Sequence, residues 1–430
     1  MVIISNKLSL KNFLIGIFAF LIMFLPRRLY FFGAFSYRIV ILFAFCLCIL
    51  LRKGKLSISN TIISIPMMIY FVLVEIISFR YLQFSTGIGF LIDTVLFLII
   101  MYNLLQTERD LHMFIDVFLL FLTIYTILGI LECFTGFNIW DLVTSTDLQR
   151  FRYGLYRSNG SSTNFTNNAA FLMLCLPIVG WKFQQEEVQK RKYAVIYGLV
   201  LLNIVATLTR SIILCIIALH FIWLVKLGLF KFIKKHFMPI LIAAAAAFLI
   251  ANIPAVSDFL KQFIDMFVAI FDDETANEIS ASFGSNANGT GQRLLLYSWV
   301  FEAVKDKIFF GLGPNHLFEY AWKTETGKSM IKSSIENQYL IHLYRYGIAG
   351  LMSYLLMVIN ILSRLWKNKE KSPDGEGKRL TLGFMMLTTV FVYFISGLFF
   401  AASDDFRMLL LLLSIFFIHC KHFIKTEPVR

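Results

Sequence analysis

The sequence has few charged residues and no cysteine pattern. Only 16% of the 430 residues are charged, against roughly 25% in a typical soluble domain. The six cysteines have neither metal-ligand spacing nor the even framework of a disulfide-rich fold, and we interpret them as small apolar residues. They are Cys46, Cys48, Cys133, Cys175, Cys215 and Cys420. These shortages argue against an ordinary soluble domain, a cysteine metal centre and a disulfide-stabilised fold.

Two motifs of other membrane-protein classes are also missing. The longest polar loop contains no D-x-D-like metal motif, and its acidic run Asp272-Asp273-Glu274 is typical of a solvated loop. The apolar segments contain no run of carboxylates and no paired Gly/Pro-broken helices, which would suggest the ion site of a transporter. The sequence therefore predicts no metal and no cofactor.

Apolar residues are abundant instead. They make up 58% of the chain, and runs of about 20 such residues are each long enough to cross a bilayer as a helix. The sequence predicts an all-α integral membrane protein with about twelve transmembrane helices and one long external loop. The first span ends near Leu25, and the others cover 33–51, 61–79, 87–105, 111–134, 167–183, 193–208, 212–229, 237–253, 338–362, 380–400 and 408–419. The predicted organisation is helices 1–9 in 1–253, with a short external segment at 136–166, the external loop in 254–337, and helices 10–12 with a cytoplasmic tail in 338–430.

The formal net charge of +13 predicts topology rather than nucleic-acid binding. Fifteen of the 40 Lys and Arg residues fall in short loops at 52–55, 184–192, 231–236 and 364–379, and alternation of the spans places all four loops on one side. Basic loops favour the cytoplasm and anionic lipid. Both termini are therefore expected in the cytoplasm, and the 136–166 segment, the turn at Arg210 and the long loop outside. No nucleic-acid partner is expected.

Four ionisable residues lie within predicted spans, where a lone charge costs several kcal/mol. They are Glu75, Asp93, Asp116 and Arg345. We favour a buried ion pair, such as Arg345 with Glu75 or Asp93, over a path for substrate or protons.

Three polar clusters share the predicted external face. The first is Arg157 to Asn164 with Asn167-Asn168, the second is Thr207 to Ser211, and the third is the end of the long loop, with Arg293, Trp299, Gly311-Leu312-Gly313-Pro314 and Glu336-Asn337. Arginine presents a planar charged fork that suits phosphate oxygens, and helix starts add backbone donors for an anion. Singly, such an arginine is more often an interfacial anchor. Together, the clusters predict an anion site.

The order of these motifs resembles the O-antigen polymerase and O-antigen ligase family of lipid-linked polysaccharide enzymes. The resemblance runs from Arg157 to Gly350. Its motifs are Arg157-x-x-Gly160 with Asn164 and Asn167-Asn168, Thr209-Arg210-Ser211, Gly291-x-Arg293 with Trp299, Gly311-Leu312-Gly313, Glu336-Asn337-x-x-Leu340 and Tyr346-Gly347-Ile348-x-Gly350.

This resemblance implies metal-independent, inverting glycosyl transfer on the outer face of a bacterial inner membrane. The implied donor is a glycan on undecaprenyl pyrophosphate, and the implied acceptor is a hydroxyl group of another glycan. Arg210 and Arg293 would bind the pyrophosphate, with Arg157 as a supporting cation. Asn167, Asn168, Asn337 and Trp299 are the other substrate-binding candidates. Membrane lipids and a chain-length regulator are the remaining candidate partners.

Glu336 departs from the family pattern, because many members, ligases especially, have His at this position. We expect Glu336 to be the catalytic group on the acceptor side; the alternative is a carboxylate that only stabilises a helix start. The leading prediction is a polymerase of oligosaccharide repeat units for O-antigen, capsule or exopolysaccharide. A ligase that moves glycan to an acceptor is the first alternative. A polysaccharide flippase or other transporter is the second, although its external loops should be short, and a scaffold or receptor would leave the arginines without a purpose.

Overall fold

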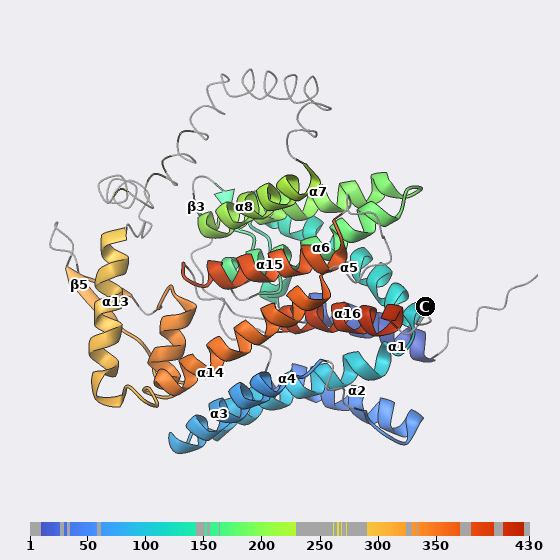
Figure 1. The fold of residues 1–430 in the computed structure, drawn as a ribbon. Coiled ribbons are helices and arrows are strands. Elements are labelled where there is room, and N and C mark those ends of the chain that lie inside the picture. Colours follow the sequence, from blue (N-terminus) through green and yellow to red (C-terminus); the bar gives the residue numbers. More distant parts are fainter. Residues whose placement is uncertain are drawn as a thin grey trace, which may run out of the picture.

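The computed structural model describes most of the chain. The described residues are 10–25, 30–31, 35–57, 62–142, 151–152, 155–162, 164–228, 290–323, 329–332, 334–369, 380–399 and 407–424, with the single residues 261, 265, 268 and 272. Within them lie twelve α-helices, which form an elongated bundle with one smaller group of elements at its left end (Figure 1).

Eleven of the twelve helices coincide with predicted spans. They are α1 (Leu10–Phe24), α2 (Tyr37–Lys53), α3 (Ile65–Arg80), α4 (Phe84–Leu104), α5 (Glu108–Thr135), α6 (Phe165–Gln185), α7 (Lys190–Ala206), α8 (Arg210–Leu227), α14 (Gln338–Asn368), α15 (Leu382–Ser396) and α16 (Arg407–Ile424). The predicted ninth span, 237–253, lies outside the described residues. The twelfth helix, α13 (Thr290–Val304), lies inside the predicted loop 254–337 and was not expected.

Short elements connect the helices. Three two-stranded antiparallel hairpins are β1 (Tyr30–Phe31) with β2 (Phe35–Ser36), β3 (Phe151–Arg152) with β4 (Leu155–Tyr156), and β5 (Tyr320–Lys323) with β6 (Ser329–Lys332). Two 3-10 turns, η1 (Ile139–Leu142) and η2 (Lys305–Lys307), complete the described elements.

Several helices begin where the sequence supplies a capping side chain. Thr107 and Asp110 form a capping box at the start of α5, and Asn164 and Thr381 cap α6 and α15. These side chains accept hydrogen bonds from backbone N–H groups that have no partner within the first turn of a helix. The helices therefore begin at positions that local chemistry determines, and their apolar middles decide how they pack.

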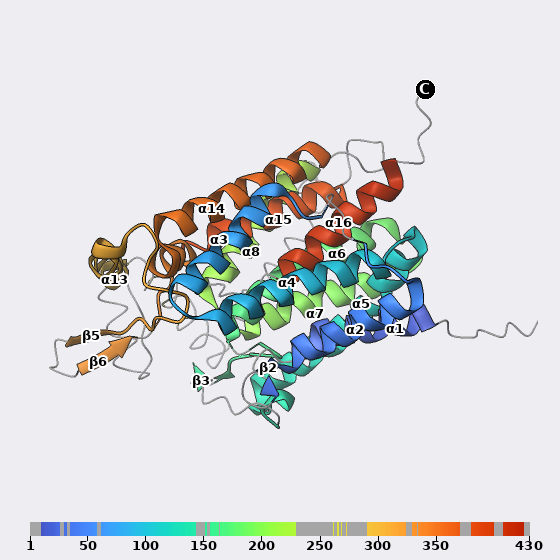
Figure 2. The same ribbon diagram turned by 90° about the horizontal axis from the view of Figure 1, so that it is seen from below.

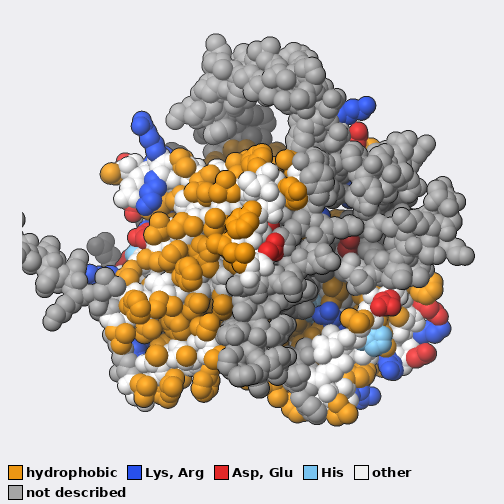
Figure 3. Space-filling view, turned by 180° about the vertical axis from the view of Figure 1, so that it is seen from behind, with side chains coloured by type: hydrophobic (Ala, Val, Ile, Leu, Met, Phe, Trp, Pro, Cys, Tyr) orange, Lys and Arg blue, Asp and Glu red, His pale blue; other side chains and the backbone are white. Residues whose placement is uncertain are grey.

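The helices have the composition of membrane spans. By length and hydropathy, four are able to cross a membrane: Gly87–Leu104, Glu108–Thr135, Arg210–Leu227 and Gln338–Asn368; shorter apolar helices accompany them. Large hydrophobic side chains also face outward along the bundle, including Ile65, Ile217 and Phe134. Figure 3 shows such side chains covering a broad face, with charged side chains gathered toward its edges. An apolar exterior this extensive needs lipid around it.

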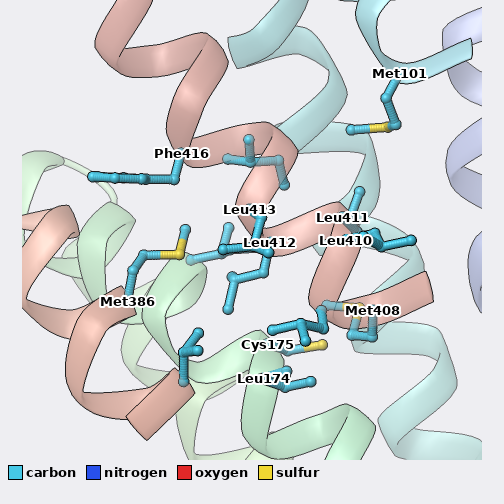
Figure 4. Close-up of a cluster of buried hydrophobic side chains, with 14 of the residues drawn as sticks. Met101, Leu174, Cys175, Met386, Met408, Leu410, Leu411, Leu412, Leu413 and Phe416 are labelled. Carbon is cyan, nitrogen blue, oxygen red and sulfur yellow. The ribbon is translucent and has the colours of Figure 1, made fainter. Parts of the chain in front are cut away.

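The centre of the bundle is built around α16. Every described side chain from Met408 to Cys420 is buried, so this helix is covered on all sides. Figure 4 shows its leucines among Leu174 and Cys175 of α6, Met386 of α15 and Met101 of α4. A helix that is apolar all round belongs in the interior of a large bundle, and α16 occupies that place here.

A second, smaller core lies beside the bundle. It joins α13 to the first half of α14 and the segment between them, through Leu296, Val300, Val304, Phe318, Ile335, Leu340, Ile341, Leu343 and Tyr344. The predicted external loop therefore contains a packed unit with its own apolar interior. In Figure 2 this unit again lies at one end of the bundle.

The two ends of the bundle differ in chemistry. At the end that we call the Lys182 end, cations join neighbouring helices: Lys11 bonds Asp110, Lys182 bonds Asp116 at 2.8 Å, and Arg364 donates to the Ile62 carbonyl oxygen at 3.4 Å. The opposite end, which we call the Asn337 end, contains the described residues of 136–164, the α7–α8 turn, the starts of α14 and α4, and the end of α15. Its joints are made mainly by backbone and neutral side-chain groups.

One prediction about charges within the spans is wrong. The two carboxylate oxygens of Glu75 are buried and have no hydrogen-bond partner among the described residues, so Glu75 does not pair with Arg345. The side chain of Asp93 lies outside the described residues. Asp116 pairs instead with Lys182, a residue that the sequence placed in the sixth span.

Helix α14 is broken at Gly347, whose φ of 66° and ψ of −167° are not helical. The segment Ile308–Gly313 lies against the break and supplies the missing hydrogen bonds. The N–H groups of Leu312 and Gly313 donate to the carbonyls of Tyr344 and Arg345, at 2.8 and 3.0 Å. Those of Ile348 and Ala349 donate to Ile308 and Phe309, at 2.7 and 3.1 Å. A broken helix in a membrane needs such partners because no water can provide them.

Candidate functional site

Helix ends that carry the predicted site residues meet at the Asn337 end. The N–H of Gln338, the first residue of α14, donates to the Gly397 carbonyl at the end of α15, at 2.7 Å. Tyr297 of α13 donates its hydroxyl to the Leu398 carbonyl at 3.3 Å. Helix α8 also packs on α15, and Trp223 donates to Thr388 at 2.7 Å. Because α8 and α15 run in opposite directions, Arg210 begins α8 near the level where α15 ends.

Glu336 is half-buried and directly precedes the cap of α14. The next residue, Asn337, is buried and accepts hydrogen bonds from the N–H groups of Tyr339 and Leu340, at 3.0 and 3.1 Å. Its side-chain nitrogen donates to the Leu398 carbonyl at 3.1 Å. Asn337 thus caps the start of α14 and joins it to α15. Glu336 directly precedes this fixed helix start.

The Gln338 side chain lies below Asn337, inside the protein. Its nitrogen contacts the His342 ring at 3.1 Å, and the ring packs against Tyr354 with centroids 4.0 Å apart. His342 is 2% exposed. These contacts place His342 in an aromatic cluster under the candidate site, as expected for a packing residue.

Arg210 is the first residue of α8 and is half-buried. It follows a strained turn: Leu208 has a φ of 50°, although it is not glycine, and is 1% exposed. A non-glycine residue in this region costs of order 1–3 kcal/mol and persists only where the surroundings determine it. The conformation of this turn sets the direction in which α8, and with it Arg210, begins. A cation at a helix start, beside backbone N–H groups, is a suitable partner for an anion.

The surroundings that determine the turn include Arg157. Its Nε donates to the Thr207 carbonyl at 3.0 Å and its Nη2 to the Leu208 carbonyl at 3.3 Å. Its guanidinium also lies over the Phe165 ring, and the side chain is 8% exposed. Arg157 was predicted as a supporting cation for substrate. Two of the nitrogens of its guanidinium group therefore hold the α7–α8 turn.

The two predicted asparagines at the start of α6 differ in their surroundings. Asn168 is fully buried; it accepts from the Tyr125 hydroxyl at 2.7 Å and donates to the Ser158 carbonyl at 3.1 Å. Asn167 is half-buried. Asn168 therefore fixes the turn that contains Arg157, whereas Asn167 lies nearer the surface of the site.

Arg293 and Trp299 belong to α13. Arg293 lies in the first turn of this helix, and its side chain is outside the described residues. Trp299 is 49% exposed, on a helix whose opposite face packs in the second core. The structure thus brings the helices of Arg210, Arg293 and Glu336 to one end of the bundle. It describes no group of three metal-ligating side chains within the covered ranges.

Sequence reasoning missed Glu132, a buried carboxylate in the last turn of α5. It is 1% exposed and accepts three hydrogen bonds, from the Asn138 side chain at 2.7 Å and from the N–H groups of Asn159 and Gly160 at 3.0 and 3.1 Å. The only signal in the sequence is an acidic residue just before Gly136, at the end of an apolar run. Its partners lie up to 28 residues away, so spacing alone does not reveal them.

Comparison with known proteins supports the motif resemblance. Residues 195–355 match a protein-family model described as O-Antigen ligase. The match includes Arg210, Arg293, Trp299, Glu336 and Asn337, and it begins after Arg157, Asn167 and Asn168. No curated protein matches the chain. Residues 195–355 are therefore similar to the O-antigen ligase family, which confirms the resemblance that the motifs within this span indicated.

Proposed function

We propose that this protein polymerises lipid-linked oligosaccharide repeat units for a bacterial surface polysaccharide. The observation that carries the proposal is the meeting of α8, α13 and the start of α14 at one end of the bundle, within the span that matches the O-antigen ligase family. Arg210 and Arg293 are the proposed ligands of the donor's pyrophosphate, and Glu336 is the proposed group that receives the acceptor's proton.

The proposed site lies at the non-cytoplasmic face of the membrane. The Lys182 end contains Lys11, Lys53, Lys182, Lys192 and Arg364 among its described cations, as expected for a cytoplasmic end. The Asn337 end would then face the compartment in which lipid-linked glycans are assembled into surface polymers. Both termini would lie in the cytoplasm.

The proposed reaction is a single inverting displacement. The acceptor hydroxyl oxygen forms a bond to the anomeric carbon of the donor sugar while the bond from that carbon to the pyrophosphate oxygen breaks. The proton of the hydroxyl passes to Glu336, and the pyrophosphate leaves with the electron pair. Arg210 and Arg293 stabilise the charge that develops on the leaving group, because preorganised cations act most strongly in a site of low dielectric constant.

The test measures polymer formation by purified variants on a lipid-linked repeat unit. Glu336→Gln keeps the size of the side chain but removes its basicity, and the rate should fall by about 10²–10⁴-fold. Arg210→Ala and Arg293→Ala should abolish polymer, and Lys should restore little because an ammonium lacks the bidentate fork. Glu302→Gln, an exposed change on α13, is the matched control. A wild-type rate for Glu336→Gln would show that Glu336 only stabilises a helix start, and normal polymer from both arginine variants would remove the pyrophosphate site.

Ligase activity is the second candidate, because the matching family carries that description. The two activities differ in cells that lack the protein. Loss of a polymerase leaves single repeat units on the acceptor, whereas loss of a ligase leaves no glycan attached. Glu336, at a position where many ligases have His, favours the polymerase.

A further inference from the structure

We propose that Glu132 is a positioning residue for Arg210 and acts through the turn of residues 157–160. This inference rests on the proposed role of Arg210 as a pyrophosphate ligand. It concerns a residue outside the span that matches the family, since Glu132 lies on α5 and the match begins at residue 195. Two consecutive sets of hydrogen bonds connect Glu132 to the start of α8.

The first set fastens the turn to α5. One carboxylate oxygen of Glu132 accepts from the N–H groups of Asn159 and Gly160, at 3.0 and 3.1 Å. The other accepts from the Asn138 amide at 2.7 Å, and that same amide donates to the Gly160 carbonyl at 3.2 Å. Glu132 and Asn138 therefore hold both sides of the backbone at Gly160.

The second set fastens the turn to the α7–α8 junction. The N–H of Ser158 donates to the Ala206 carbonyl at 3.0 Å. Arg157 donates to the next two carbonyls, those of Thr207 and Leu208. Three successive carbonyls before Thr209 are thus held by two neighbouring residues. These bonds fix the strained conformation of Leu208, and Arg210 begins α8 two residues later.

The turn has little freedom to adjust if Glu132 is lost. Gly160 has a φ of 55°, and a Cβ there would lie 2.1 Å from the Tyr125 hydroxyl oxygen. A Cβ on Gly129 would lie 2.4 Å from the Asn203 side chain and 2.6 Å from the Ser158 hydroxyl. Close packing on both sides means that a change in the hydrogen bonds at Glu132 is transmitted to Arg157 rather than absorbed locally.

The chemistry of the partners requires a carboxylate at position 132. All three partner groups are N–H donors, so both oxygens must be acceptors. In Glu132→Gln one of the two positions becomes an NH2 group and faces a donor in either orientation. Exchanging the pair, as Glu132→Gln with Asn138→Asp, restores an acceptor opposite each of these donors, because the new amide donates to Asp and its oxygen faces the two backbone N–H groups. The exchange also removes the Asn138 amide that donates to the Gly160 carbonyl, so it restores the network only in part.

The experiment measures kcat and KM for the lipid-linked donor in purified protein, together with the midpoint of thermal unfolding. Glu132→Gln should lower kcat/KM by about 10–100-fold, because a displacement of about 1 Å at a reacting group has effects of this size. The Glu132→Gln, Asn138→Asp pair should recover only part of that loss, because the Gly160 carbonyl loses its side-chain donor. Glu187→Gln, an exposed change at the Lys182 end, is the matched control and should keep the wild-type values.

A double-variant comparison separates positioning from general destabilisation. In an Arg210→Lys background the bidentate fork is already lost, so adding Glu132→Gln should change the rate by less than about twofold. An equal fold-loss in both backgrounds, or a wild-type rate for Glu132→Gln alone, would overturn the inference. A wild-type rate for Arg210→Ala alone would instead overturn the proposed role of Arg210 as a pyrophosphate ligand. If neither Glu132 variant folds, the same comparison with Arg157→Lys, whose ammonium cannot hold both carbonyls, decides between these outcomes.

Discussion

Replacing Gly347 by alanine should strongly destabilise the protein, because two independent features of the structure require glycine there. The residue has a φ of 66°, and an added Cβ would lie 2.4 Å from backbone atoms of Phe309 and Phe310. With its ψ of −167°, this conformation is open essentially to glycine alone and costs another residue of order 1–3 kcal/mol. The clash involves backbone rather than a flexible side chain, so Ile308–Gly313 would have to move away from α14.

The cost of that movement follows from the hydrogen bonds at the break. Four backbone bonds join the segment to α14. Each bond contributes about 0.5–1.5 kcal/mol, and a buried group left without a partner costs about 1–3 kcal/mol. Loss of two of the four bonds removes about 1–3 kcal/mol. Added to the conformational cost, this gives about 2–6 kcal/mol, a large part of the roughly 5–15 kcal/mol that keeps a protein folded.

Gly198→Ala is the matched control for this prediction. Gly198 lies within α7, and an added Cβ would have no atom within 4 Å. Alanine favours a helix over glycine by up to about 1 kcal/mol, so this variant should be as stable as the wild type or slightly more stable. The assay is thermal unfolding in detergent at one heating rate, since such unfolding is commonly irreversible. Equal midpoints for Gly347→Ala and Gly198→Ala would refute the account of the break.

Three further predictions concern capping, charge and topology. Asn337→Ala should lose about 0.5–2 kcal/mol of stability through its lost cap, whereas Asn337→Asp keeps the acceptor and should lose less; equal thermal midpoints would contradict this. Asp116→Asn should destabilise more than Lys182→Met, because it leaves the buried Lys182 ammonium without its partner at 2.8 Å, whereas Met removes that charge; unfolding midpoints in the opposite order would count against it. Reporter fusions after Lys55 and Lys192 should give a cytoplasmic signal and fusions at Ser162 an outside signal; a cytoplasmic signal at Ser162 would place the site on the wrong side.

The sequence was sufficient to predict where the helices of the bundle lie, for a simple physical reason. An apolar run between polar or basic residues has one stable solution in a bilayer, and the bounds of α5 and α8 differ from the predicted spans by only a few residues. The candidate residues Arg210 and Glu336 came from the order of the motifs, and the structure places both at helix starts, Arg210 as the first residue of α8 and Glu336 just before the cap of α14. Apolar runs and helix starts are local features of the sequence, so they can be predicted without knowing which distant segments pack together.

The unexpected parts of the structure depend on contacts between distant segments. The apolar residues of α13 in its core, Leu296, Val300 and Val304, recur at helical spacing, but their core partners lie about 15–50 residues further along the chain. The sequence identified Gly311 and Gly347 only as members of two separate motifs. Their mutual approach, in which a Cβ on Gly311 would lie 2.6 Å from the Gly347 nitrogen, is a property of the folded protein. The role of Arg157 likewise depends on carbonyls 50 residues away.

Glu75 offers a final prediction, about a buried charge that the fold does not pair. Its two oxygens have no hydrogen-bond partner among the described residues, and the side chain is 8% exposed. Gly87 makes room for it, since a Cβ there would lie 2.6 Å from a carboxylate oxygen. An acidic residue near the centre of a membrane helix costs about 2.5–3.5 kcal/mol on insertion scales. Replacing Glu75 by a neutral residue of similar size should therefore stabilise the protein.

Glu75→Gln and Glu75→Met should accordingly raise the unfolding midpoint, with Met giving the larger rise because it leaves no polar atom unsatisfied. Gly87→Ala, which crowds the same carboxyl, should lower it. The comparison uses the same detergent assay, with Glu108→Gln, an exposed change on α5, as the control. A fall in stability for both Glu75 variants would show that the carboxyl has a partner which stabilises it, and the cost argued from its burial would then be wrong.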